Sequence, residues 1–332
     1  MSLPKFEYIA PKTLAKAVAV QNEGGKFLAG GTDLYVAMKQ RMISPGVLID
    51  LNAIPKLKKV RGDKKGVLKI GALASLSRIK ESPVVKSHLP TLCKIIPSVS
   101  TPQLRNMGTI GGNLCLDTRC SYYNQPLLLK KRWEPCLKIG GKVCHVVKGK
   151  KSCFSVYSGD MAAPLMALGA KVKVVGPDVS RELALKDFFT GSGVKPNFLV
   201  DNEILTEIIV QKMPRYAGLS YQKLRLRDTM DFPLLGIAVR IHLDEPNGRC
   251  LDFCLSMGAV APAPFIVEEA GDVMRGNTIT PELINEVTVL AGKRAHPVAN
   301  TAAEPRYRKQ MGPVLTKKAI MEALDRIKNA SD

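Results

Sequence analysis

The Gly-Gly pair at Gly30-Gly31 constrains the N-terminal fold more than any other feature of the sequence. It follows the apolar run Phe27-Leu28-Ala29 and precedes a segment with helical periodicity, after which a second apolar run extends from Val47 to Leu51. This pattern predicts a strand, a tight glycine turn, a helix and another strand. Residues 1–55 are therefore expected to form a small α/β unit.

The remaining sequence divides into two further regions. Residues 56–216 alternate short strand patterns, such as Leu68 to Ile70 and Val172 to Val175, with helices and glycine-rich loops. Residues 217–332 predict strands over 234–243 and 251–260 and helices over 282–294 and 307–328. In the middle region, residues 114–157 match neither helical nor strand periodicity, and a loop of this length is usually functional.

Charge and targeting signals narrow the function only slightly. The net charge of +20 fits nucleic acid, an anionic ligand or an acidic protein partner. The basic residues are scattered, aromatic residues make up only 5%, and no helix-turn-helix, zinc-finger or ribonucleoprotein pattern is found, so a nucleic-acid role is not expected. With no secretory signal and no apolar run of spanning length, we expect a cytoplasmic protein without a membrane segment.

Two loops carry residue types suited to a phosphate-containing ligand. In Ala29-Gly30-Gly31-Thr32-Asp33, the glycines permit a tight turn and the close approach of a phosphate, although such turns also occur for structural reasons alone. The stretch from Thr101 to Asn113 adds polar side chains and three more glycines, where a ligand could lie against exposed backbone amides.

The AGGTDL and TIGGN motifs in these loops resemble those of the FAD-binding subunits of the xanthine dehydrogenase and carbon monoxide dehydrogenase family of molybdenum enzymes. The resemblance extends over nearly the whole chain. It implies an α+β protein: a flavin-binding fold of two α/β subdomains (1–55 and 56–216) of the PCMH/vanillyl-alcohol-oxidase type, followed by a C-terminal α+β domain (217–332) like that of CO dehydrogenase flavoproteins. It also implies FAD contacts from Leu28, Ala29, Gly30, Gly31, Thr32, Asp33 and Leu34 in the first loop and from Thr101, Gln103, Asn106, Thr109, Gly111, Gly112 and Asn113 in the second.

Three later residues match the family's pattern less specifically. Asp160, in Ser158-Gly159-Asp160-Met161, corresponds to an aspartate that contacts the adenosine part of FAD. Leu205 and Lys223 correspond to flavin-proximal positions on later strands. Leu205 is equally well explained as an ordinary core residue, and Lys223 as a solvated surface charge.

Five of the eight cysteines lie between Asn113 and Ser158, and four thiolates are what a [4Fe–4S] cluster requires. This insertion resembles the one in the flavin subunit of 4-hydroxybenzoyl-CoA reductases, which implies Cys120, Cys136, Cys144 and Cys153 as cluster ligands. Cys115 and, less so, His145 remain alternative ligands, and a structural zinc site is the alternative metal centre. Zinc sites usually use paired cysteines separated by two to four residues, which this stretch lacks. Outside it, Cys93, Cys250 and Cys254 are expected to be buried thiols, the last two on one face of a strand.

The resemblance implies an electron-transfer subunit rather than one with its own acid/base catalysis. Electrons from ferredoxin would pass through the [4Fe–4S] cluster and FAD to [2Fe–2S] clusters in a small partner subunit and to molybdenum in a molybdopterin-containing large subunit, within a heterohexamer of two heterotrimers. The complete enzyme would remove the hydroxyl group of 4-hydroxybenzoyl-CoA. The alternative is an oxidative molybdenum hydroxylase of another aromatic or heterocyclic substrate, with electrons flowing outward.

Overall fold

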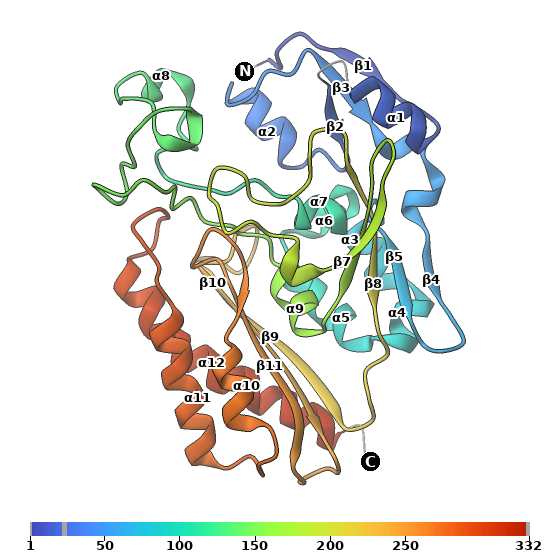
Figure 1. Ribbon diagram of the computed structural model, residues 1–332, viewed down its shortest axis with the longest axis vertical. Coiled ribbons are helices and arrows are strands. Elements are labelled where there is room, and N and C mark those ends of the chain that lie inside the picture. The colour runs from blue at the N-terminus through green and yellow to red at the C-terminus, as the bar shows by residue number, and fades with distance from the viewer. Residues whose placement is uncertain (1, 22–24, 330–332) are drawn as a thin grey trace.

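The computed structural model describes residues 2–21 and 25–329, and within them the chain forms three β-sheets flanked by helices (Figure 1). The combination of separate sheets and surrounding helices confirms the predicted α+β class. Each sheet is built from a different part of the sequence, and the three follow one another along the chain.

The first sheet is parallel and has the strand order β1-β3-β2. Parallel strands need crossover connections, and helices α1 and α2 provide them. Thr13 begins α1, since its Oγ1 accepts a hydrogen bond from Lys16 N at 3.3 Å, and Ala17 and Val18 bury their side chains with Ile49. The elements are β1 (Glu7–Ile9), α1 (Leu14–Gln21), β2 (Lys26–Leu28), α2 (Leu34–Lys39) and β3 (Val47–Asp50).

The second sheet is antiparallel, in the order β4-β5-β8-β6-β7. Its strands are β4 (Val60–Gly62), β5 (Leu68–Gly71), β6 (Lys171–Val175), β7 (Ser180–Ala184) and β8 (Ile204–Val210). Helices α3 (Leu76–Glu81), α4 (Pro83–His88), α5 (Pro90–Ile95), α6 (Pro102–Met107), α7 (Ile110–Leu114) and α9 (Ala162–Ala167) accompany it. A proline occupies the first turn of α4, α5 and α6, where its missing N–H leaves no intrahelical bond unmade. Short 3-10 turns cover Leu51–Ala53, Pro55–Lys58, Ile96–Ser98 and Leu185–Asp187.

The third sheet, in the order β12-β11-β10-β9, is antiparallel and is shared between two cores. On β10, Ile237, Val239 and Ile241 belong to a core with the C-terminal helices, whereas Ala238 faces the core of the second sheet. In Figure 1 the helices α10, α11 and α12 lie along one side of this sheet. The elements are β9 (Ala217–Leu224), β10 (Leu235–Leu243), β11 (Cys250–Gly258), β12 (Phe265–Ile266), α10 (Glu268–Met274), α11 (Pro281–Arg294) and α12 (Pro305–Lys328).

A β-bulge corrects the expectation that Cys250 and Cys254 share a face of their strand. The pairing of β10 with β11 shifts register between His242 and Leu243, which leaves Leu251 without a partner. One extra residue reverses the alternation of side chains. Cys250 therefore lies in the core with the C-terminal helices, whereas Cys254 packs against the core of the second sheet.

Residues 114–157, which we call the cysteine insertion, leave the second sheet between α7 and α9 and project to one side of the molecule (Figure 1). They contain the helix α8 (Leu127–Lys130) and a 3-10 turn at Leu137–Ile139. Arg119 and Val156 form an isolated antiparallel bridge that closes the base of the insertion, with N···O distances of 2.7 Å in both directions. The absence of longer elements agrees with the lack of periodicity in the sequence.

The described helices include none that combines the length and apolar character needed to cross a bilayer.

Candidate functional site

The first glycine loop turns sharply at the end of β2. Gly31 has φ of +72°, a conformation that favours glycine, and Leu28 anchors the strand in the core. Asn52 steadies the turn from outside, because its Nδ2 donates a 2.8 Å hydrogen bond to the carbonyl of Ala29. Asn52 lies 23 residues away, and no sequence motif indicates this role.

The second loop is organised by two threonine caps. Thr101 Oγ1 accepts a hydrogen bond from Leu104 N at the start of α6, and Thr109 Oγ1 accepts one from Gly112 N at the start of α7, at 3.3 Å and 3.1 Å. Gln103 and Asn106 lie on α6 with exposed side chains. The two predicted threonines therefore shape the loop, while the two amides are free to reach a ligand.

The two glycine loops lie against each other. A Cβ atom added to Gly30 would come within 2.1 Å of the Met107 carbonyl oxygen, so the backbones approach more closely than a side chain would permit. A Cβ on Gly112 would lie 3.9 Å from that of Ala29. The structure therefore brings the two predicted motifs together, with Gly30 against the backbone at Met107 and Gly112 beside Ala29.

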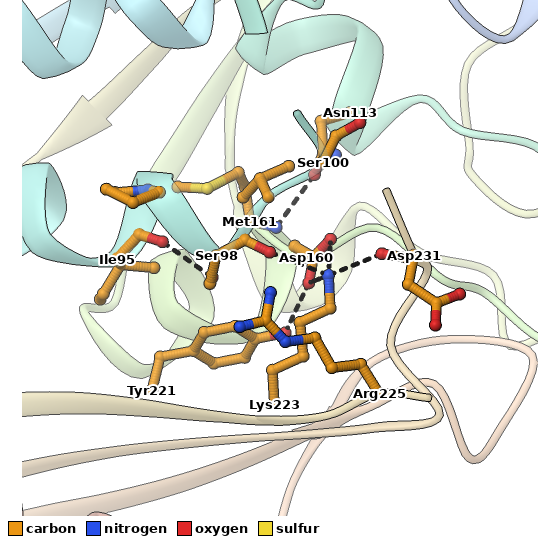
Figure 2. Close-up of polar contacts among 12 residues, drawn as sticks. Ile95, Ser98, Ser100, Asn113, Asp160, Met161, Tyr221, Lys223, Arg225 and Asp231 are labelled. Carbon is orange, nitrogen blue, oxygen red and sulfur yellow. Dashed lines mark hydrogen bonds and ion pairs between the residues drawn. The ribbon is translucent and has the colours of Figure 1, made fainter. Parts of the chain in front are cut away.

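A buried cluster around Asp160 adjoins the second loop (Figure 2). Asn113, the last residue of that loop, accepts a 2.9 Å hydrogen bond from Met161 N through its Oδ1. Asp160 in turn accepts hydrogen bonds from Tyr221 Oη at 3.0 Å and from Lys223 Nζ at 3.1 Å. Burial raises the pKa of Asp160 to about 6, and the positive charge of Lys223 limits the rise.

Lys223 is buried, so the interpretation of this residue as a solvated surface charge is wrong. Only 3% of its side chain is exposed, and its Nζ donates to the carbonyl oxygens of Ser98 and Asp231, at 3.0 Å and 2.8 Å, as well as to Asp160. Three acceptors match the three N–H bonds of an ammonium group. Lys223 thus joins β9, the loop before α6 and the loop after β9 (Figure 2).

Two other residues of this region have clear structural roles. Leu205 on β8 belongs to the core of the second sheet, and this packing is sufficient to account for an apolar residue there. Arg105 on α6 donates from Nη1 to the carbonyl oxygens of Pro97, Val99 and Ser100, at 3.0, 2.7 and 2.8 Å. Arg105 therefore fixes the turn before α6, a role that the sequence motif did not reveal.

The four predicted cysteine ligands line one recess in the insertion. Cys120, Cys136, Cys144 and Cys153 share it with Tyr122, Tyr123, Lys138 and His145. Burial raises the pKa of the Cys120 thiol, and the neighbouring Cys136 and Cys144 raise it further. Burial also raises the pKa of Cys153, and Lys138 opposes that shift. The thiols are therefore near enough to interact, although they lie up to 33 positions apart in the sequence.

The alternative ligands are placed differently. Cys115 ends α7 and packs against the core of the second sheet, and its burial there raises the pKa of its thiol to about 12. His145 does line the recess, but its ring stacks on Tyr122 and its Nε2 lies 2.8 Å from the carbonyl oxygen of Glu134. Cys115 therefore lies outside the recess, whereas His145 shares it with the four cysteines.

The spread of the four thiols bears on which metal centre they fit. In the described part of the chain, no three Cys, His, Asp or Glu side chains converge where a single ion could bind. A tetrahedral zinc ion needs its ligands within about 2.3 Å of one point. An iron–sulfur cluster instead takes one thiolate at each iron, so its ligands stand apart around a shared space. The four thiols that line the recess are the donor set that such a cluster would use.

Lys138 places a positive charge at this recess. Only 4% of its side chain is exposed, and its Nζ donates to Asp117 Oδ1, Thr118 Oγ1 and the Gly193 carbonyl oxygen, each at 2.7 Å. A buried cation is stable only when such partners are present. Lys138 thereby ties the insertion to the loop after β7 and opposes the rise in the pKa of the Cys153 thiol.

Two family models together match most of the chain. Residues 4–212 match the FAD binding domain in molybdopterin dehydrogenase, and residues 220–323 match the CO dehydrogenase flavoprotein C-terminal domain. The chain is 26% identical to the nicotinate dehydrogenase FAD-subunit of Eubacterium barkeri, over 97% of each chain. It is 31% identical to an aldehyde oxidoreductase FAD-binding subunit of Escherichia coli, over 80% of this chain and 84% of that one. A carbon monoxide dehydrogenase structure from Hydrogenophaga pseudoflava superposes with a TM-score of 0.82 at 27% identity, covering 98% of this chain and 99% of that one.

Proposed function

Because the chain belongs to the family of FAD-binding subunits of molybdopterin dehydrogenases, we propose that it transfers electrons within a molybdenum-containing 4-hydroxybenzoyl-CoA reductase, using FAD and a [4Fe–4S] cluster. The family accounts for the flavin and for an oxidoreductase role. The observation that carries the more specific proposal is the recess, where four cysteines gather while Cys115 is buried elsewhere.

The proposed FAD site is formed by the two glycine loops and the Asp160 cluster. The close packing of the two motifs at Gly30 and Gly112, where a side chain would not fit, supports one ligand site shared by both loops. Asp160 and Lys223 supply buried polar groups beside Asn113, and FAD would supply the redox chemistry, which the protein tunes by position and charge. The predicted contacts from Leu28 to Leu34, from Thr101 to Asn113, and at Asp160, Leu205 and Lys223 form part of this proposal.

The proposed cluster ligands are Cys120, Cys136, Cys144 and Cys153. They would hold the metal at the end of the insertion, and Lys138 would remain beside it as a fixed positive charge. A cluster with four thiolates is an anion, so a buried cation nearby favours its binding. Electrons would enter at this cluster and continue through the subunit to its partners.

The proposed partners are a molybdopterin-containing large subunit and a small subunit with [2Fe–2S] clusters, in a heterohexamer of two heterotrimers, with a cytoplasmic location and ferredoxin as the donor. Residues 114–157 carry nine Lys or Arg against two Asp or Glu, and this excess supports an acidic donor protein. Reduction by ferredoxin should slow as salt is added, because screening shortens the reach of the attraction. A reduction rate that is independent of salt would argue against ferredoxin docking on the insertion.

The second candidate is an oxidative hydroxylase with outward electron flow, which the similarity to nicotinate dehydrogenase and aldehyde oxidoreductase subunits favours. The two candidates differ in the order of reduction potentials. A cluster potential well below that of the flavin supports inward flow, and a higher potential supports the oxidative candidate.

The first test is an absorbance spectrum of the anaerobically purified complex together with iron, sulfide, zinc and flavin analysis. About four irons and one FAD per copy of this chain support the proposal. FAD with zinc would leave an ordinary flavin subunit with a structural metal. Cysteine-to-serine variants then test the ligands: C120S, C136S, C144S and C153S should each lose iron, and C115S should retain it. Iron loss in C115S alone overturns the ligand assignment.

A further inference from the structure

We propose that Arg119 couples the cysteine recess to the first glycine loop, so that FAD binding and metal loading strengthen each other. This inference rests on the proposed function for the metal, whereas its electrostatic part concerns the flavin loop alone. Arg119 immediately precedes Cys120, yet its side chain leaves the insertion and forms an ion pair with Asp33 of the AGGTD motif. The two residues are 86 positions apart.

Within the described residues, the carboxylate of Asp33 accepts no hydrogen bond other than the one from Arg119. It stands at the N-terminal end of α2, where an aspartate commonly caps the helix, but its side chain accepts no capping hydrogen bond. Burial raises the pKa of Asp33, and Arg119 is the charge that opposes this rise. Arg119 of the cysteine insertion thus neutralises the carboxylate of Asp33 in the first glycine loop.

The backbone of Arg119 is set by the base of the insertion. It exchanges two hydrogen bonds with Val156, both 2.7 Å, so the residue is held between Cys120 on one side of the recess and Cys153 near the other. Its guanidinium carbon lies 3.9 Å from the centre of the Phe232 ring in the loop after β9. A change in the recess therefore moves the group that neutralises Asp33.

The orientation of Arg119 leaves one donor unused. Its Nε is buried and has no hydrogen-bond partner within the described residues. Buried donors are normally satisfied, and an unsatisfied one indicates either strain or a missing acceptor. An anionic ligand in the first glycine loop would supply negative charge close to this guanidinium. Without Arg119, the same ligand would meet the unpaired carboxylate of Asp33 and be repelled by it.

The test measures FAD affinity by flavin fluorescence in the deflavinated complex, with the full chain as wild type, R119M, D33N and the double variant. We expect R119M to weaken FAD binding about tenfold or more, within the range usual for coupled sites. D33N in the R119M background should restore most of the affinity, because it removes the unpaired charge. The matched control is R132M, which removes an exposed arginine of the same insertion and should leave FAD affinity unchanged.

The coupling itself is tested by repeating the titration after iron removal with a chelator. Wild type should then bind FAD more weakly, and R119M should show no further loss, because the connection is already broken. By reciprocity, FAD should slow iron loss in wild type and not in R119M. R119K, which keeps the charge, should fall between the two and shows whether R119M has only disturbed folding.

Three outcomes overturn the proposal: R119M binding FAD as wild type does, no recovery in the double variant, or equal sensitivity to iron removal in wild type and R119M. If purified wild type contains no iron, the cluster proposal fails by metal analysis. The comparison of R119M with the double variant still decides whether Arg119 neutralises Asp33 for FAD.

Discussion

The glycine loops and the cysteine insertion are adjacent, but different kinds of interaction determine their conformations. In the glycine loops, local backbone geometry sets the shape: Thr101 and Thr109 cap helices, and Gly31 adopts a positive φ. In the insertion, regular structure is limited to the short helix α8 and a 3-10 turn. Long-range side-chain contacts hold the chain there, chiefly those of Arg119 and Lys138. A segment of the second kind is ordered mainly by what it binds.

Removing the proposed cluster should separate the two regions most clearly. Metal binding to small structural sites contributes on the order of 10 kcal/mol, far more than the hydrogen bonds of the insertion can replace. After iron removal by a chelator, amides of residues 119–156 should lose hydrogen-exchange protection, while those of β5, β6 and β8 keep theirs. Unchanged protection in the insertion would mean that its side-chain contacts suffice, and the contrast between the regions would disappear.

The second-largest effect on stability should come from breaking the buried Asp160–Lys223 pair beside the glycine loops. Lys223→Met leaves Asp160 buried beside a neutral side chain, and breaking a buried ion pair costs about 3–5 kcal/mol. Calorimetry of the variant should show a lower melting temperature, and flavin analysis should show reduced FAD content. Lys212→Met is the matched control at an exposed position. A K223M protein as stable as wild type would show that the pair contributes little to this region.

The dependence of the melting temperature on pH should identify the contribution of Asp160. The pKa of Asp160 is raised to about 6 from an ordinary value of 3.8, so between these values the folded protein keeps a proton that the unfolded chain has lost. Stability from this group is therefore greatest at low pH, falls as pH rises through the window, and levels off above about 6. Melting temperature measured against pH should lose this component in D160N. Parallel curves for wild type and D160N would contradict the assignment.

The smallest effect we predict lies at the recess. Lys138→Met removes three hydrogen bonds at the base of the insertion, a loss of about 1–3 kcal/mol confined to that segment. Limited proteolysis should cut the insertion faster in K138M than in the exposed-site control K142M, at equal FAD content. Faster FAD loss in K138M would show that the contacts of the insertion also stabilise the glycine loops.

The sequence was a good guide wherever neighbouring residues determine the outcome. The strand, glycine turn and helix around Gly30-Gly31 and the long final helix both follow from local sequence pattern, and the structure confirms them. The gathering of four cysteines in one recess followed from the family resemblance of the insertion rather than from periodicity.

Contacts between residues that are far apart in the sequence produce no local sequence pattern. Asn52 and Arg105 hold carbonyl groups of the loops, and neither role has a motif. Lys223 is buried because acceptors from three segments meet it, which cannot be seen from its own strand. The single extra residue at Leu251 likewise reversed the expected placement of Cys254, since a bulge depends on pairing rather than on composition.

The position of Asn300 near the end of the chain has a consequence for the timing of assembly. Its carbonyl accepts a hydrogen bond from Ser121 N at 2.9 Å, and its Nδ2 donates to the Phe154 carbonyl at 2.6 Å, so it joins both sides of the insertion. The fully buried Arg308 reaches the same residue and the carbonyl groups of Leu234 and Ala259. Domains complete themselves in order of synthesis, and these contacts form only after the ribosome has passed residue 308. We therefore expect the recess to mature only after residue 308 has been synthesised, long after the glycine loops have formed.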